Sequence, residues 1–303
     1  MLEQFYEDIK VRQERMRKRS KAQFRSYLLE QAAKLGLEAT IYPKSWASKN
    51  VVVGNIHQAD LIIGAHYDTP PIMFRWMANH LILFNIVIIL MGWFILPIMI
   101  LTFIPGSLGI WVYFAFIIFF ICYLMGFLAI PNRHNMNDNS SGVLAILTLM
   151  SEVRNDKVAY VFFDNEEKGL VGSLLLAKQL KKLRKNYIVL DCVGTGTIFT
   201  LYHYNKPFIA DRLKMLFDIK SSFPYSCEVK KGGYLATSDH MSFMHKNHVG
   251  IMSLELRNNK KVLRDIHSRH DKTINLENIR VLCDWITRYI GDKYGNFTRE
   301  KTE

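Results

Sequence analysis

Five short fragments of this chain, far apart in sequence, carry the side chains that bind pairs of divalent metal ions in proteins. Each fragment borders an apolar run, and together they supply histidines, aspartates and a Glu-Glu pair. Imidazole and carboxylate groups at strand ends are the usual ligands of a catalytic metal pair. The pattern therefore predicts a two-metal catalytic site. The fragments are residues 65–68, 137–142, 164–167, 190–194 and 267–271.

The first fragment places His66 directly after the apolar run 61–65, which is typical of a strand buried on both faces of a sheet. A single histidine in such a place is weak support for a metal site. Asp68, two residues on, has the spacing to hold the imidazole of His66 through its second ring nitrogen. The pair together indicates a ligand and the group that orients it.

The next three fragments supply carboxylates. Asp138 lies where a helix is expected to begin, so it is either a helix N-cap or a carboxylate that bridges two ions. Glu166 and Glu167 follow the apolar run 158–163. One of this pair could bind metal while the other faces the attacking water, and the alternative is a solvated acidic loop. Asp191 ends a further apolar run, a position that favours a functional carboxylate over a surface one.

The last fragment leaves the choice of ligand open. His267 and His270 flank a Ser-Arg pair, and either imidazole could bind metal. Each signal is weak on its own.

Around these fragments, apolar runs of strand length alternate with segments of helix length. This alternation is typical of a largely parallel sheet with helices on both faces. We predict an α/β fold with a mostly parallel central sheet flanked by helices. The predicted helices are residues 2–19, 21–35, 141–153, 168–183, 207–219 and 275–291, and the predicted strands are residues 38–42, 50–55, 60–65, 158–163, 187–191, 197–202 and 249–254.

Between the first two fragments the chain is apolar over a membrane-like length. Residues 76–132 contain no Asp, Glu, Lys or Arg. Two segments within this stretch are each long enough, as helices, to span roughly 30 Å of hydrocarbon. So long an uncharged stretch argues against a hairpin buried in a globular core. We predict a transmembrane helical hairpin over 72–131, inserted into a catalytic domain formed by 1–71 and 132–303.

Charge sets the predicted orientation of this hairpin. Arg75 precedes it and Arg133 follows it, while the turn between its helices is uncharged. Because positively charged flanks favour the cytoplasmic side, we expect an integral membrane protein with two transmembrane helices. Its catalytic domain and both termini are expected to be cytoplasmic, and the site is expected to lie close to the bilayer.

Composition narrows the expected partners. The formal net charge is +12, from 39 basic and 27 acidic residues. Much of the excess lies in residues 10–25, which we expect to face anionic lipid of the bilayer. No pattern supports a nucleic-acid partner. The four cysteines form no CxxC pair, which favours reduced thiols, and no short apolar segment at the N-terminus suggests a secretory signal.

Taken in order, the fragments resemble the motifs of the M28 family of zinc aminopeptidases. The resemblance covers about residues 20–290 apart from the predicted hairpin. It implies the zinc-aminopeptidase fold and a cofactor of two Zn²⁺ ions, for which other divalent ions can substitute. The motifs are residues 66–69, 137–142, 163–173, 191–194, 238–240 and 267–271.

The resemblance also implies a ligand set. One ion would take His66, Asp138 and Asp191. The other would take Asp138, Glu167 and His267, so that Asp138 bridges the two ions.

It further implies catalytic roles. Glu166 would be the general base that deprotonates a metal-bound water and then protonates the leaving amine, and Asp68 would act with it in catalysis. His267 is preferred over His270 because the family's ligand lies four residues before an aspartate, here Asp271. The residues implied for substrate binding are Tyr234, Asp239 and His240.

We therefore predict a membrane-anchored di-zinc aminopeptidase whose substrates are peptides with a free N-terminus, including membrane-associated ones. A hydrolase of the same scaffold that acts on an aminoacyl-lipid or another amide is the alternative. A glutaminyl cyclase is less favoured because both ligand sets are complete, and a non-catalytic membrane receptor or scaffold is less favoured because no ligand is lost.

Overall fold

The computed structural model describes residues 1–43, 45–75, 130–220, 224–232 and 237–295, together with five residues between 111 and 118. The strands before and after the predicted insertion belong to one sheet. β3 (Leu61–His66), which precedes it, lies between β4 (Val158–Phe163) and β5 (Asn186–Leu190), which follow it. The two sequence-distant parts of the chain therefore fold together.

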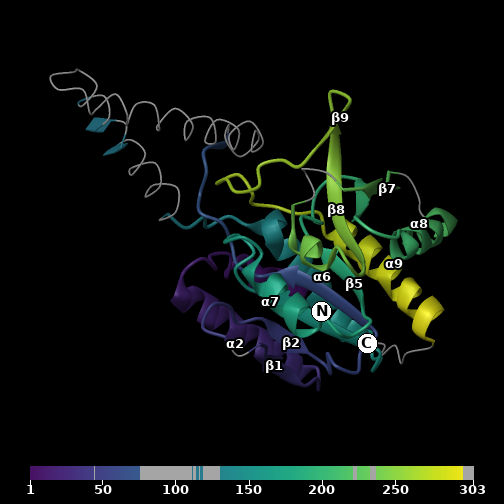
Figure 1. The fold of residues 1–303 in the computed structure, drawn as a ribbon. Coiled ribbons are helices and arrows are strands. Elements are labelled where there is room, and N and C mark those ends of the chain that lie inside the picture. The colour runs from purple at the N-terminus through teal and green to yellow at the C-terminus, as the bar shows by residue number, and fades with distance from the viewer. Residues whose placement is uncertain are drawn as a thin grey trace, which may run out of the picture.

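The described strands form a nine-stranded sheet in the order β1-β2-β4-β3-β5-β8-β6-β7, with β9 paired to β8 (Figure 1). Its centre, β4-β3-β5-β8, is parallel as predicted. Antiparallel pairing joins β1 to β2, β2 to β4 and β6 to β8, so the sheet as a whole is mixed. The remaining strands are β1 (Ala39–Ile41), β2 (Val51–Val53), β6 (Ile198–His203), β7 (Ser226–Lys231), β8 (Asn247–Arg257) and β9 (Lys260–Val262).

Helices cover both faces of this sheet and divide the core in two. Alternate side chains of the strands point to opposite faces. On one face they pack in the larger cluster with α1, α2, α6, α8 and α9, and on the other they pack with α7 and η3. The helices are α1 (Leu2–Lys10), α2 (Lys18–Lys34), α6 (Ser141–Glu152), α7 (Val171–Gln179), α8 (Phe208–Lys220) and α9 (Leu276–Tyr294), with the short turns η1 (Met136–Ser140) and η3 (Asp239–Phe243).

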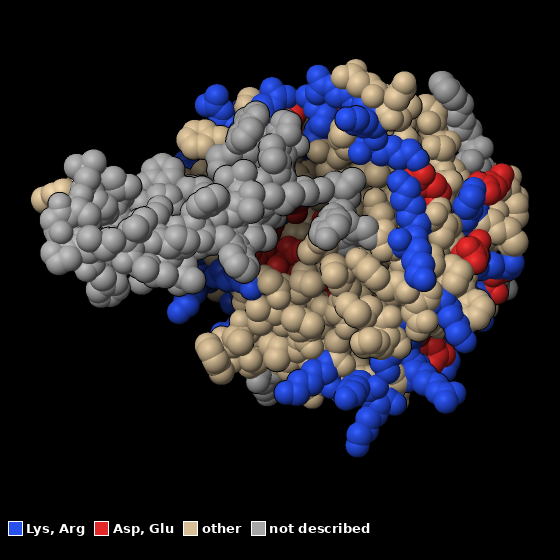
Figure 2. Space-filling view, turned by 45° about the horizontal axis from the view of Figure 1, so that its top comes forward, with Lys and Arg blue, Asp and Glu red and all other residues tan. Residues whose placement is uncertain are grey.

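The parallel strands bring the predicted site fragments to one edge. β3 ends at His66, β4 ends one residue before Asp164, and β5 ends one residue before Asp191. Because parallel strands point the same way, their carboxyl ends meet at the same edge of a sheet, where open α/β sheets place their ligands. Figure 2 shows acidic side chains recessed in a hollow on one face of the molecule, while Lys and Arg side chains lie on the surface of the same face.

The membrane prediction requires correction. Among the residues that the structure describes, no helix is long and apolar enough to cross a bilayer. The hairpin predicted over 72–131 falls mainly outside those residues. This finding overturns the prediction of an integral membrane protein with two transmembrane helices, which rested on the apolar length and the missing charges of residues 76–132.

The structure describes the two ends of the predicted insertion, where it joins the domain. Pro71 and Pro131 form an antiparallel bridge, and Ile72 N donates to Ile130 O at 2.9 Å. Met73 N also donates to His267 O at 2.7 Å. The chain therefore leaves and re-enters the domain beside one of the predicted metal ligands.

The basic N-terminal segment also differs from its prediction. Instead of one helix over 2–19, the first helix ends at Lys10, and residues 11–17 are not helical. Arg15 and Lys21 are only 0% and 6% exposed. These two cations lie inside the domain rather than facing lipid, while Arg17, Lys18 and Arg19 remain exposed.

Candidate metal centre

Asp138 lies at the centre of the candidate site, with its two carboxylate oxygens facing different histidines. Oδ1 lies 3.4 Å from His66 Nε2, and Oδ2 lies 2.9 Å from His267 Nε2. Asp138 is 3% exposed. It sits in η1, where the backbone departs from helical geometry at φ −111° and ψ 100°. Its side chain is therefore directed by the local turn and not by the regular helix α6 that follows.

His66 is held by the end of β3 and by the turn after it. Its Nδ1 lies 3.1 Å from the backbone oxygen of Asp68, and its Nε2 lies 3.6 Å from Asp191 Oδ1. The predicted contact was with the Asp68 carboxylate, which is 3.9 Å from Nδ1. That carboxylate instead accepts hydrogen bonds from the backbone nitrogens of Glu166 at 3.0 Å and Glu167 at 3.3 Å. Asp68 thus joins the histidine loop to the Glu-Glu loop.

The Glu-Glu pair lies at the mouth of the centre. Glu166 and Glu167 are both half-buried. Glu167 Oε2 lies 3.8 Å from His267 Nε2. Glu166 shares a group of closely spaced ligand atoms with His66 and Asp191. The two neighbouring glutamates therefore lie near different candidate ligands, Glu167 near His267 and Glu166 near His66 and Asp191.

His267, and not His270, lies beside Asp138. His267 has a left-handed backbone, with φ 58°, and its ring faces the carboxylates. His270 is exposed. Asp271 was used in the sequence analysis only to choose between His267 and His270. In the structure it is 3% exposed. Its carboxylate accepts from Asn137 N at 2.7 Å and from Asp138 N at 3.0 Å, so it fixes the backbone that carries Asp138.

Two buried cations support the site from behind. Arg15 Nε donates to Tyr67 O at 2.5 Å, and its Nη2 donates to Ser140 Oγ at 2.9 Å. Lys21 Nζ donates to Asp164 Oδ1 at 2.7 Å and to Asn165 Oδ1 at 2.6 Å. No motif pointed to either residue. The basic character of the segment was visible in the sequence, but its position was not.

The donor set fits divalent metal ions. Three groups of ligand atoms, each group within 4.8 Å, lie in the described part of the chain. Ligands about 2.0–2.2 Å from a tetrahedral zinc ion lie roughly 3.3–3.6 Å from one another, close to the separations found here. Glu167 Oε1, Asp191 Oδ1 and His267 Nδ1 are buried without a hydrogen-bond partner. The groups are His66–Asp138–Glu167, His66–Glu166–Asp191 and Asp138–Asp191–Cys192.

The pKa shifts of the buried groups also indicate that a cation fits this site. Burial raises the pKa of Glu166 well above its ordinary value, and the nearby carboxylate of Glu167 raises it further. Burial alone would lower the pKa of His66, but the surrounding carboxylates raise it well above the ordinary value. So many acidic groups in a buried space favour a bound cation.

The predicted substrate residues are less accessible than the predicted metal ligands. Asp239 is fully buried, and burial raises its pKa to about 7. His240 is fully buried too, and its ring stacks on Tyr204 at 5.7 Å and His248 at 5.8 Å. Burial lowers the pKa of His240 to about 3. Tyr234 lies outside the described residues.

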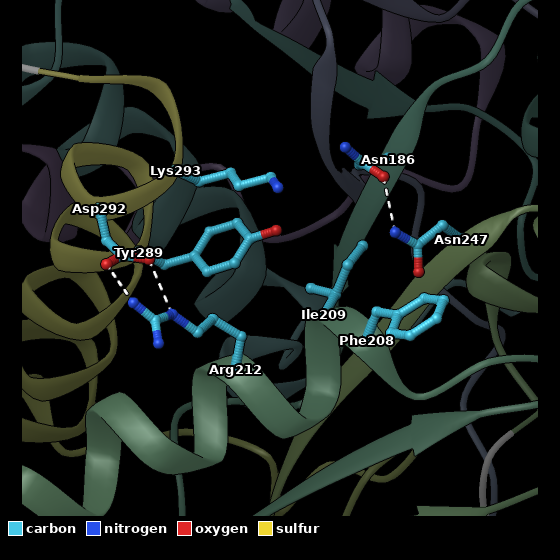
Figure 3. A pocket seen from close by; sticks show the side chains of 8 residues that line it. All are labelled: Asn186, Phe208, Ile209, Arg212, Asn247, Tyr289, Asp292 and Lys293. Atoms are coloured by element: carbon cyan, nitrogen blue, oxygen red, sulfur yellow. Dashed lines mark hydrogen bonds and ion pairs between the residues drawn. The ribbon is translucent and has the colours of Figure 1, made fainter.

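A cavity of about 620 Å³ lies elsewhere, between α8, α9 and the amino ends of β5 and β8 (Figure 3). Four of its polar side chains pair with one another. Arg212 Nε donates to Asp292 Oδ2 at 2.8 Å, and Asn247 Nδ2 donates to Asn186 Oδ1 at 2.7 Å. Since the ligand-bearing fragments lie at the carboxyl ends of the strands, this cavity is at the opposite edge of the sheet and is not part of the metal centre.

Fold and site together define a metal-dependent hydrolase of the zinc-exopeptidase type. Residues 126–283, a little over half of the chain, match Peptidase family M28, and the chain belongs to this family. His66 and Asp68 lie before the matched region. A search of curated proteins found no match to this chain.

Solved structures share the fold at low identity. LapA aminopeptidase of Legionella pneumophila aligns with a TM-score of 0.63 and 14% identity, over 98% of this chain and 72% of LapA. Glutaminyl cyclase of Porphyromonas gingivalis aligns at 0.66 and 13%, over 97% and 98% of the two chains. A Zn-dependent exopeptidase of Parabacteroides distasonis aligns at 0.60 and 14%, over 96% and 97%. At these identities the likeness shows the fold alone.

Proposed function

We propose that the chain is a two-zinc aminopeptidase that removes residues from the free N-terminus of peptides. The observation that supports this most is the division of the Asp138 carboxylate, with one oxygen 3.4 Å from His66 and the other 2.9 Å from His267. A carboxylate between two imidazole groups suits a bridge between two ions.

The ligands would then form two sets that share Asp138. His66 and Asp191 would complete one set, and Glu167 and His267 would complete the other. When bound, the zinc ions would supply Lewis-acid activation of water and of the scissile carbonyl. Other divalent ions with a preference for nitrogen and oxygen ligands could occupy the same groups.

A side chain of the protein would transfer the proton during hydrolysis. Glu166 would act as general base, taking a proton from the attacking water and delivering it to the leaving amine. It is half-buried at the mouth of the centre, and its backbone is fixed by the bond from its nitrogen to Asp68. Asp68 is therefore a positioning residue for both His66 and Glu166.

A second candidate is cyclisation of an N-terminal glutamine, because structural neighbours include glutaminyl cyclases. The paired ligand sets favour hydrolysis over this reading. Both reactions act at the free N-terminus of a peptide, so one experiment can separate them.

The test is incubation of the purified chain with a peptide library, half of it with free and half with acetylated N-termini, with and without a strong chelator. Mass spectrometry reads the products. We expect loss of the first residue from free N-termini only, and only without chelator. Loss of ammonia from peptides that begin with glutamine, with no shortening, would replace the aminopeptidase by a cyclase. Cleavage of acetylated peptides would contradict both.

A further inference from the structure

The non-helical segment before α2 reaches two loops that carry metal ligands. Arg15 Nε donates to the backbone oxygen of Tyr67 at 2.5 Å, next to His66. Its Nη2 donates to Ser140 Oγ at 2.9 Å, two residues after Asp138. The backbone nitrogen of Arg15 also donates to Thr69 Oγ1 at 2.9 Å. One side chain thus joins the loop after β3 to the turn before α6.

This side chain has little freedom to move. Arg15 is 0% exposed. Its guanidinium lies 4.7 Å from the ring of Phe24, which stacks on Tyr67 at 6.0 Å. Nη1 donates to Arg12 O at 3.0 Å. Hydrogen bonds at its nitrogens and an aromatic ring against it fix the guanidinium in one place.

The positive charge of Arg15 also suits its position near several carboxylates. Burial lowers the pKa of Arg15 to about 10, and Asp68, Asp138 and Asp271 oppose that shift. The group therefore carries a positive charge at neutral pH, behind a cluster of carboxylates. The hydrogen bonds of its side chain go to Tyr67 O, Ser140 Oγ and Arg12 O, so Arg15 acts through the loops that it holds.

We propose that Arg15 is a positioning residue that sets the spacing between the His66 loop and the Asp138 turn, and through it the affinity of the metal centre. This inference rests on the metal site of the proposed function. Arg15 lies outside residues 126–283, the part of the chain that matches the family. The planar fork of the guanidinium makes the bridge, since its donors lie in fixed directions that the single ammonium of lysine cannot reproduce.

The experiment compares zinc affinity in four full-length proteins: wild type, Arg15→Lys, Ser140→Ala and Arg17→Lys. Arg17→Lys is the matched control because Arg17 is exposed on the same segment. Metal-free protein is titrated with zinc against a competing chelating dye. Because supporting residues of metal ligands typically contribute roughly 10- to 100-fold in affinity, we expect losses in this range for Arg15→Lys and Ser140→Ala. Arg17→Lys should match wild type.

A spectroscopic measurement separates positioning from general stability. Co²⁺-loaded Arg15→Lys should show an altered visible absorption spectrum, which reports ligand geometry. Leu213→Ala in α8, a fully buried core position, provides a destabilised control. It should lower the melting temperature of the metal-free protein while leaving zinc affinity and the Co²⁺ spectrum unchanged. A Co²⁺ spectrum of Arg15→Lys equal to that of wild type would overturn the proposal.

The double variant Arg15→Lys/Ser140→Ala completes the test. Both changes break the same hydrogen bond, so their effects on zinc affinity should be less than additive. Additive losses, or unchanged affinity in folded Arg15→Lys and Ser140→Ala, would refute the positioning role and leave the proposed function intact. A wild-type chain that binds no zinc would refute both.

Discussion

His267 Nε2 lies 2.9 Å from Asp138 Oδ2, although the two residues are far apart in the sequence. The contact joins the loop after β9 to the turn before α6. It forms because Asp271, on the histidine loop, accepts hydrogen bonds from the backbone of the Asp138 turn. The candidate ligand His267 and its supporting residue Asp271 thus belong to the same short loop.

This relationship predicts different outcomes for two nearby histidines. In the proposed two-zinc centre, His267→Ala should lose one of the two ions and most of the activity, because its imidazole faces Asp138 and Glu167. His270→Ala should retain both, because His270 is exposed. Metal analysis of dialysed protein measures the stoichiometry. Loss of zinc from His270→Ala alone would exchange the two assignments.

Glu166→Gln separates metal binding from proton transfer. The amide keeps the size of the side chain but cannot accept the proton from water. We expect zinc content to match wild type and kcat to fall by roughly 100- to 10,000-fold, the usual contribution of a general base. Steady-state kinetics and metal analysis on the same preparation provide the measurement. Wild-type turnover in this variant would remove Glu166 from the mechanism.

The centre of the fold follows from local sequence. Continuous apolar runs predicted the strands 60–65, 158–163 and 187–191, and β3, β4 and β5 lie within a residue of them. Such strands are buried on both faces, so their sequences carry a strong signal. The strands at the edges of the sheet carry a weaker signal in their sequences. β7 (Ser226–Lys231) is polar and partly exposed, and no strand was predicted there.

The supports of the site could not be predicted, because they depend on contacts between distant residues. Arg15 binds Tyr67 and Ser140, which are 52 and 125 positions away. Read locally, Arg15 is one more basic residue in a charged segment. The motifs indicate candidate ligands in the sequence, whereas the side chains that hold the loops of these candidates can be identified only in the folded chain.

The buried pair of Lys21 and Asp164 gives a prediction about stability. Their side chains are 7% and 4% exposed, and Nζ lies 2.7 Å from Oδ1. Lys21→Met would leave the Asp164 charge buried without its cation, which typically costs about 3–5 kcal/mol. Denaturant unfolding of metal-free protein measures this loss.

Two further variants control this prediction. Lys18→Met changes an exposed lysine of the same helix and should alter the free energy of unfolding by less than about 0.5 kcal/mol. Lys21→Met/Asp164→Asn removes the isolated charge and should recover part of the loss. If Lys21→Met proves as stable as Lys18→Met, the ion pair does not stabilise the fold.

Gly64 provides a test of how the sheet positions His66. It lies in the middle of β3, and a Cβ atom there would meet Cε2 and Cζ of Phe163 at 2.3 and 2.7 Å. Gly64→Ala should therefore lower the free energy of unfolding by about 1–3 kcal/mol, as overpacking of a close-packed core does. Zinc affinity should fall as well, because His66 is two residues further along the same strand. Phe163→Leu makes room for the methyl group, so the double variant should be less destabilised than the sum of the two single changes. Additive losses would mean that the new methyl group and the Phe163 ring do not interact, and that overpacking against this ring is not the cause of the loss.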